Sequence, residues 1–170
     1  MGNHMHLLVV PETKTALSRG IGSTNLMYTR YLNHKLNQSG RIRQNRFFSC
    51  VVESEQYLWA VTCYIERNPL KAGLAASAET YRGSSAKAHV IGINDPLLDA
   101  TPWLSPQKRS AYAAFVGDED KETDNAICLA TRTGRPLGTE QCIDQLEFRL
   151  NQPLRPGKPG RPRTKTGKCP

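Results

Sequence analysis

Residues 47–74, FFSCVVESEQYLWAVTCYIERNPLKAGL, predict a strand followed by a helix. Residues 47–52 are apolar and partly β-branched, which is typical of a strand. Ser54 is a suitable N-cap for a helix, and Pro69 and Gly73 predict where that helix ends. The side chains that recur at helical spacing, and so predict its buried stripe, are Leu58, Val61 and Ile65.

Tyr64 and Asn68 stand four residues apart on this helix, so both project from one face. Near the N-terminus, a strand over residues 4–10 would place His4 and His6 on one face of a sheet. Two imidazoles spaced in this way can chelate one cation. A cloning remnant, or two solvated histidines, is the alternative interpretation. These residues alone leave both interpretations open.

The composition favours a basic protein that binds a polyanion. The chain has 23 Lys and Arg against 15 Asp and Glu, a net charge of +8, and a pI near 9.4. Such an excess points to a polyanion, most simply nucleic acid, although a basic protein with no such partner is the alternative. No apolar run approaches the roughly 18 residues of a membrane span, and the first residues of the sequence do not have a signal-peptide profile. We therefore expect a cytoplasmic protein.

The cysteines predict free thiols. The five are scattered, odd in number and form no C-x-x-C pair: Cys50, Cys63, Cys128, Cys142 and Cys169. This pattern is typical of a reducing compartment and indicates neither a disulfide framework nor a zinc site.

A basic and aromatic segment follows a helix predicted within residues 23–38. Its arginines are Arg41, Arg43 and Arg46, and Phe47 and Phe48 come directly after them. Cations interleaved with aromatic rings suit a single nucleic-acid strand, with phosphates on the charges and bases on the rings. For the two phenylalanines, a place in the core is an equal alternative.

Residues 75–125 are less informative. Ser105 and Pro106 predict the start of a helix that ends at Phe115. His89 is interpreted as a partly buried structural histidine, with a role in the site as the alternative. The acidic cluster over residues 118–124 is interpreted as a solvated loop or a helix start, with a second metal site as the alternative.

Residues 122–150 predict a helix, a turn and a second helix. The first helix covers residues 126–132, and Thr139 caps the second, whose inner face would carry Ile143, Leu146 and Leu150. With Arg132 and Arg135 at the junction, the pair is compatible with helix-turn-helix DNA binding. A plain pair of helices packed on the preceding domain is the alternative.

The C-terminal tail, residues 151–170, has six basic and no acidic residues from Arg155 onward, with repeated Pro and Gly. Such a composition predicts a disordered basic tail. Arg161 and Arg163 lie in a GRPR sequence that resembles a minor-groove-binding arm, and general attraction to phosphates explains it equally well.

Several motifs in series resemble those of the REP-associated tyrosine transposases, a bacterial branch of the single-tyrosine HUH transposases. They are NHMHLL (3–8), QNRFFS (44–49), YIERNPLKAGL (64–74), YRGSSA (81–86), TGRPLG (133–138) and GRPR (160–163). The resemblance covers nearly the whole chain in the correct order. It implies an α+β fold with a ferredoxin-like antiparallel sheet over residues 1–115, followed by a helical DNA-binding segment.

The resemblance also implies a chemistry and a set of site residues. Tyr64 would be the nucleophile that forms a 5′-phosphotyrosine with single-stranded DNA and releases a 3′-hydroxyl. His4, His6 and Asn68 would hold a divalent metal, Mg²⁺ or Mn²⁺, that polarises the scissile phosphate. The expected substrate is a repetitive palindromic DNA hairpin, and a monomer and a dimer are both compatible with the sequence.

Three departures from the family bear on activity. Gly2 stands where a Pro is usual, and Arg43 stands where an aromatic residue, often Trp, is usual. The first strand, first helix and second strand of the expected fold have no counterpart ahead of His4, so the sequence predicts an N-terminally incomplete catalytic domain. The alternative function is therefore a non-catalytic DNA-binding remnant. A replication-initiator or relaxase nuclease is disfavoured, because those chains carry a longer histidine motif.

Overall fold

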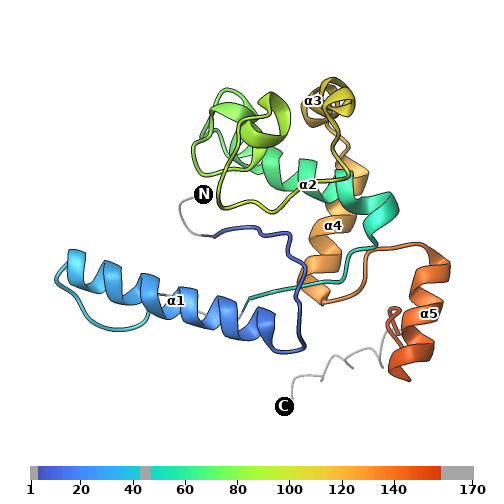
Figure 1. The fold of residues 1–170 in the computed structure, drawn as a ribbon. Helices are drawn as coiled ribbons and strands as arrows, with labels where there is room; N and C mark the ends of the chain where they lie inside the picture. Colours follow the sequence, from blue (N-terminus) through green and yellow to red (C-terminus); the bar gives the residue numbers. More distant parts are fainter. Residues whose placement is uncertain (1–3, 43–46, 158–170) are drawn as a thin grey trace, which may run out of the picture.

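Helices dominate the computed structural model, which describes residues 4–42 and 47–157 (Figure 1). The α-helices are α1 (Ala16–Lys35), α2 (Ser54–Lys71), α3 (Arg109–Gly117), α4 (Lys121–Thr133) and α5 (Glu140–Leu150). Three short helical turns complete the elements: η1 (Ala78–Thr80), η2 (Lys87–Ile91) and η3 (Pro106–Lys108).

The expected α+β fold with a ferredoxin-like antiparallel sheet is wrong for the described residues. They contain no sheet, and the single β-type pairing is an isolated parallel bridge between Val52 and Leu137. Residues 4–10 and 47–51 are not helical, but no neighbouring strand pairs with either segment in the described chain. An apolar β-branched run becomes a strand only when a second strand accepts its hydrogen bonds, so sequence pattern alone was insufficient.

Two hydrophobic clusters pack against α2 from different sides. In the first, Cys63 packs among residues of η1, of α3 and of the segments just before η2 and η3: Ala78, Tyr112, Val116, Ala86 and Leu104. In the second, Val61 packs against Ile127 and Ala130 of α4 and against Leu137. The helix α2 therefore lies between the α3 region and α4, and both clusters fix its position (Figure 1).

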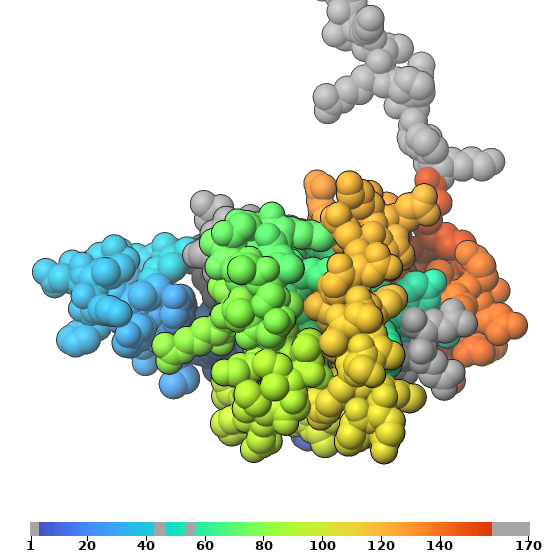
Figure 2. All heavy atoms as spheres, turned by 90° about the horizontal axis from the view of Figure 1, so that it is seen from above, coloured from blue at the N-terminus to red at the C-terminus, as the bar shows by residue number. Residues whose placement is uncertain are grey.

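The helix α1 lies at one end of the molecule, and α5 lies at the opposite end (Figure 2). No residue of α1 is buried. Large apolar side chains are exposed on α1 and on the segments before and after it, among them Leu7, Val10, Leu26, Met27 and Phe48. Most of the buried core therefore belongs to residues 59–137.

The predicted helices over residues 54–68 and 140–150 are confirmed, and their ends follow simple rules. The Thr139 hydroxyl accepts a hydrogen bond from the Cys142 N–H and caps α5 as predicted. Ser105 and Pro106 begin η3 as N-cap and first residue. For α2 the N-cap is Glu53 rather than Ser54, and Pro69 lies inside its last turn rather than beyond it.

Two helices begin earlier than expected. The helix α1 starts at Ala16, and α4 starts at Lys121 because the Asp120 carboxylate accepts hydrogen bonds from the Glu122 and Thr123 N–H groups.

The predicted inner face of α5 is not buried, since Leu150 is largely exposed and no residue of α5 falls in the core. In the part of the chain that is described, no helix combines the length and apolarity needed to cross a membrane.

Candidate functional site

Tyr64 lies on α2 beside the histidine pair of the N-terminal segment. The His6 and Tyr64 rings meet edge-on, with centroids 5.6 Å apart. The His4 and His6 rings also meet edge-on, with centroids 5.1 Å apart. The structure thus brings together three of the four residues that the sequence assigned to the site.

Asn68, the fourth residue, follows Tyr64 by one helical turn. Its Nδ2 donates a hydrogen bond of 2.7 Å to the Tyr64 carbonyl oxygen. The side-chain amide therefore has a fixed orientation on α2. The bond is a side-chain contact to the carbonyl one turn earlier within the helix, and it uses the amide nitrogen, so the amide oxygen stays a metal-ligand candidate.

Burial shifts the acidity of two groups in the site. It raises the pKa of the Tyr64 phenol, which disfavours the phenolate. Burial and the neighbouring His4 lower the pKa of His6. A neutral imidazole is the form that binds a metal, whereas a phenol with a raised pKa needs a nearby positive charge to become a nucleophile.

The donor atoms fit a divalent cation with mixed ligands. Among the described residues, no group of three or more His, Cys, Asp or Glu side chains could hold a metal ion. The candidate set is instead two adjacent imidazoles and one amide oxygen, so solvent or substrate oxygens would complete the coordination. Such a set suits Mn²⁺ or Mg²⁺ better than it suits a structural Zn²⁺ ion, which is usually held by four protein ligands.

Glu66 anchors the opposite face of α2, since two residues along a helix correspond to a rotation of about 200°. Its side chain is fully buried. One carboxylate oxygen lies 2.6 Å from the Ser85 hydroxyl and 2.6 Å from His89 Nδ1, and the other accepts a 2.8 Å hydrogen bond from the Tyr112 hydroxyl. A buried carboxylate with three partners ties α2 to η2 and α3.

Two cations near the C-terminal end of α2 share one buried carboxylate. Arg67 donates to Asp124 of α4 at 2.9 Å and to the Asp118 carbonyl, and Lys71 also donates to Asp124. Lys71 makes a second ion pair with Glu119 at 3.2 Å. The hydrogen bond to Asp124 raises the pKa of the Lys71 ammonium, which therefore stays charged. These pairs hold α2 against α4.

The arginines predicted to bind DNA are spread over the chain. Arg41 and Arg132 are exposed, and Arg135 is half-buried. The other four lie outside the described residues: Arg43, Arg46, Arg161 and Arg163. Phe47 and Phe48 are exposed, so the alternative of two core phenylalanines is wrong.

The helix α5 carries more negative than positive charge. Its acidic residues are Glu140, Asp144 and Glu147, against one basic residue, Arg149. Arg155 pairs with all three carboxylates at 2.6–2.7 Å. A recognition helix in the major groove normally presents cations or amides to the DNA. The acidic face of α5 therefore favours the plain helix pair over helix-turn-helix binding.

Sequence reasoning missed Glu66 and Asp124 as organising residues. Glu66 lies on the same side of α2 as the apolar side chains of Cys63, Trp59 and Leu70. A charged residue on the apolar side of a helix is a signal for a buried polar network. Asp124 was assigned to a solvated cluster, yet it is only 6% exposed. His89, 7% exposed and bound to Glu66, has the structural role expected of it.

Comparisons with known proteins do not assign the chain to a family. No family model matches the chain, and neither the curated proteins nor the solved structures contain a match. The resemblance to tyrosine transposases therefore depends on the motifs in the sequence.

Proposed function

We propose that this chain is a single-stranded DNA nuclease and strand transferase of the tyrosine transposase type. The observation that carries the proposal is the edge-on contact of the His6 and Tyr64 rings, with His4 beside them. The chain separates these residues by 58 positions, so their contact is a property of the fold. A histidine pair next to a tyrosine is the minimum set for metal-assisted attack of a phenol on a phosphodiester.

The roles of the protein groups follow from this arrangement. A divalent cation, held by His4, His6 and Asn68, would neutralise charge on the scissile phosphate when bound. The Tyr64 Oη attacks phosphorus, the bond from phosphorus to O3′ breaks, and the phenol proton goes to the departing 3′-oxygen through solvent. The product is a 5′-phosphotyrosine with a free 3′-hydroxyl. Attack by a second 3′-hydroxyl reverses the step and joins DNA ends without a nucleotide cofactor.

The charge of the chain supports a nucleic-acid substrate. Its net charge is +8. Arg41 is exposed shortly before the exposed rings of Phe47 and Phe48, a combination that suits an unpaired strand. A hairpin with single-stranded flanks is the substrate class we assign, with the nucleoid of a bacterial cell as its location.

A covalent-adduct assay tests the proposal. The full chain is incubated with Mn²⁺ and a 5′-labelled and a 3′-labelled hairpin oligonucleotide, and the products are resolved on a denaturing gel. We expect a protein adduct that retains the DNA 3′ to the cut and that disappears in Tyr64→Phe and without metal. Tyr31→Phe, an exposed tyrosine of α1, is the matched control and should behave as wild type.

The same assay separates the nuclease from a non-catalytic DNA-binding remnant. Binding of the hairpin without any adduct, over a range of Mn²⁺ and Mg²⁺ concentrations, would assign the chain to the remnant. An adduct that persists in Tyr64→Phe would place the nucleophile elsewhere.

A further inference from the structure

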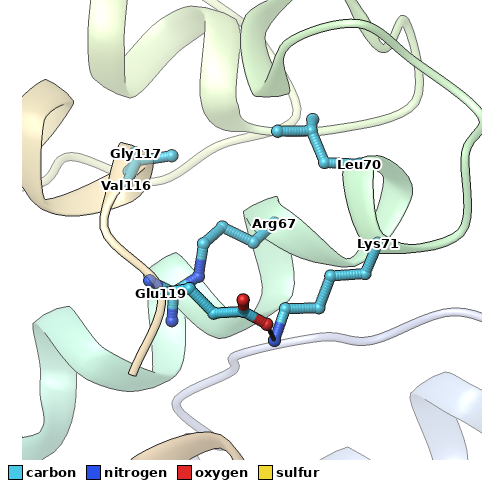
Figure 3. A pocket seen from close by; sticks show the side chains of 6 residues that line it. All are labelled: Arg67, Leu70, Lys71, Val116, Gly117 and Glu119. Atoms are coloured by element: carbon cyan, nitrogen blue, oxygen red, sulfur yellow. Dashed lines mark ion pairs between the residues drawn. The ribbon is translucent and has the colours of Figure 1, made fainter. Parts of the chain in front are cut away.

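A hollow of about 530 Å³ lies between the C-terminal half of α2 and residues 116–119 (Figure 3). Its lining consists of Arg67, Leu70, Lys71, Val116, Gly117 and Glu119. Lys71 and Glu119 meet across it as an ion pair (Figure 3). The hollow therefore combines an apolar wall with two cations and one exposed carboxylate.

The hollow is aligned with the candidate site along α2. Lys71 follows Tyr64 by seven residues, which places both on nearly the same helical face, with Asn68 between them. Seven residues span about 10 Å along the helix axis. A DNA strand that lies along this face with one phosphate at Tyr64 would bring a phosphate a few nucleotides away to Lys71.

The two carboxylates around Lys71 differ in how firmly they are held. Asp124 is buried and binds both Arg67 and Lys71, so it belongs to the structural contact between α2 and α4. Glu119 is half exposed, with 50% of its side chain accessible, and its ion pair is with Lys71. An exposed ion pair contributes little to stability, so Glu119 is the replaceable anion.

One N–H group of Arg67 makes no hydrogen bond to the described residues. Its side chain is buried, yet its Nε has no hydrogen-bond partner among the described residues. A buried guanidinium N–H without an acceptor is uncommon and costs free energy. That N–H is itself buried, so an anion in the hollow would meet Arg67 as a neighbouring positive charge rather than as a hydrogen-bond donor.

We propose that this hollow is a subsite for a backbone phosphodiester of single-stranded DNA, and that Glu119 occupies the place of that phosphate until DNA binds. The single negative charge of a phosphodiester replaces the single charge of the carboxylate, so the charge balance at Lys71 is unchanged. The assignment of DNA as the ligand rests on the proposed function. The subsite itself rests on the hollow, the two cations that line it and the displaceable carboxylate.

The test uses two substitutions that remove the same ion pair but have opposite expected effects. In the Tyr64→Phe background, which prevents cleavage, the affinity for a fluorescent single-stranded oligonucleotide is measured by anisotropy at several salt concentrations. Lys71→Gln should weaken binding several-fold and reduce the salt slope by about 0.7, the value for one phosphate contact on a single strand. Glu119→Gln should strengthen binding several-fold, because the competing carboxylate is gone.

Matched controls remove the same charges on the first turn of α4. Lys121→Gln and Glu122→Gln alter the net charge equally, and both residues are exposed. If Lys71→Gln matches Lys121→Gln and Glu119→Gln matches Glu122→Gln, the subsite is overturned even when the wild type forms a covalent adduct. Opposite shifts beyond these controls uphold the subsite, including in the case that no adduct forms and the nuclease assignment fails.

Discussion

The imidazole ring of His6 and the phenol ring of Tyr64 lie edge-on at 5.6 Å, across the junction between the N-terminal segment and α2. Hydrophobic packing holds α2 from two sides, whereas most apolar side chains of residues 4–10 are exposed. The site thus combines a firmly held nucleophile with metal-ligand candidates on a segment that has few packing contacts. Binding of a cation would add a link between the two.

The first prediction concerns the histidine pair. His6→Gln removes one of two imidazoles that lie 5.1 Å apart and should lower Mn²⁺ affinity by at least about tenfold, the smallest loss typical of damage to a metal site. Titration followed by Mn²⁺ electron paramagnetic resonance measures this directly. His34→Gln, on exposed α1, is the control and should leave the affinity unchanged. Equal affinities in wild type and His6→Gln would remove His6 from the ligand set.

The second prediction concerns the buried Glu66. Glu66→Ala leaves His89, Tyr112 and Ser85 without their shared acceptor and should lower the free energy of unfolding by about 3–5 kcal/mol. Glu66→Gln keeps the volume and one acceptor oxygen, so its loss should be smaller. Urea unfolding measures both, and the exposed Glu12→Ala should change stability by less than about 0.5 kcal/mol. A loss for Glu66→Ala no larger than that of Glu12→Ala would mean that the network does not support α2.

The third prediction concerns the ion pair between α2 and α4. Because Arg67 and Asp124 are both buried, Asp124→Leu alone should cost about 3–5 kcal/mol, since it leaves Arg67 and Lys71 without their common anion. Arg67→Met together with Asp124→Leu should cost less than the sum of the single changes, with a coupling of about 0.5–3 kcal/mol. A double-mutant cycle in urea gives the coupling, and additive losses would show that the two charges do not interact.

Local patterns predicted the helices better than the global fold. The spacing of Val61 and Ile65 identified α2, and Thr139 identified the start of α5, because caps and periodic stripes are properties of neighbouring residues. His6 and Tyr64 were paired through a motif resemblance, and the structure places their rings in contact. The contact was thus expected, while the activity assigned to it stays a prediction.

Contacts between residues that are far apart in the chain could not be predicted from the sequence pattern. The apolar run over residues 47–52 predicted a strand, yet pairing requires a second strand, and the β-type pairing in the described part of the chain is a single bridge from Val52 to Leu137. Arg67 and Asp124 are 57 positions apart, and nothing local distinguishes this aspartate from the solvated acidic residues around it. Periodicity reports which face of an element is apolar, whereas it does not report which other element covers that face.

The last prediction concerns the Cys63 thiol, which packs in the cluster between α2 and α3. Burial raises the pKa of Cys63 to about 12, well above the ordinary value of a thiol. Above about pH 9 the thiol ionises in the unfolded chain but stays protonated in the folded one. The unfolded state then binds fewer protons, so stability must fall as the pH rises, by up to about 1.4 kcal/mol per pH unit, until the folded thiol ionises near pH 12.

Urea unfolding between pH 7.5 and 10.5 under reducing conditions should therefore show a shallower decline for Cys63→Ala than for wild type. Titratable groups that do not contact Cys63 are common to both proteins and cancel in the difference. Cys128→Ala, which alters an exposed thiol, should follow the wild-type slope, and parallel curves for wild type and Cys63→Ala would contradict the raised pKa.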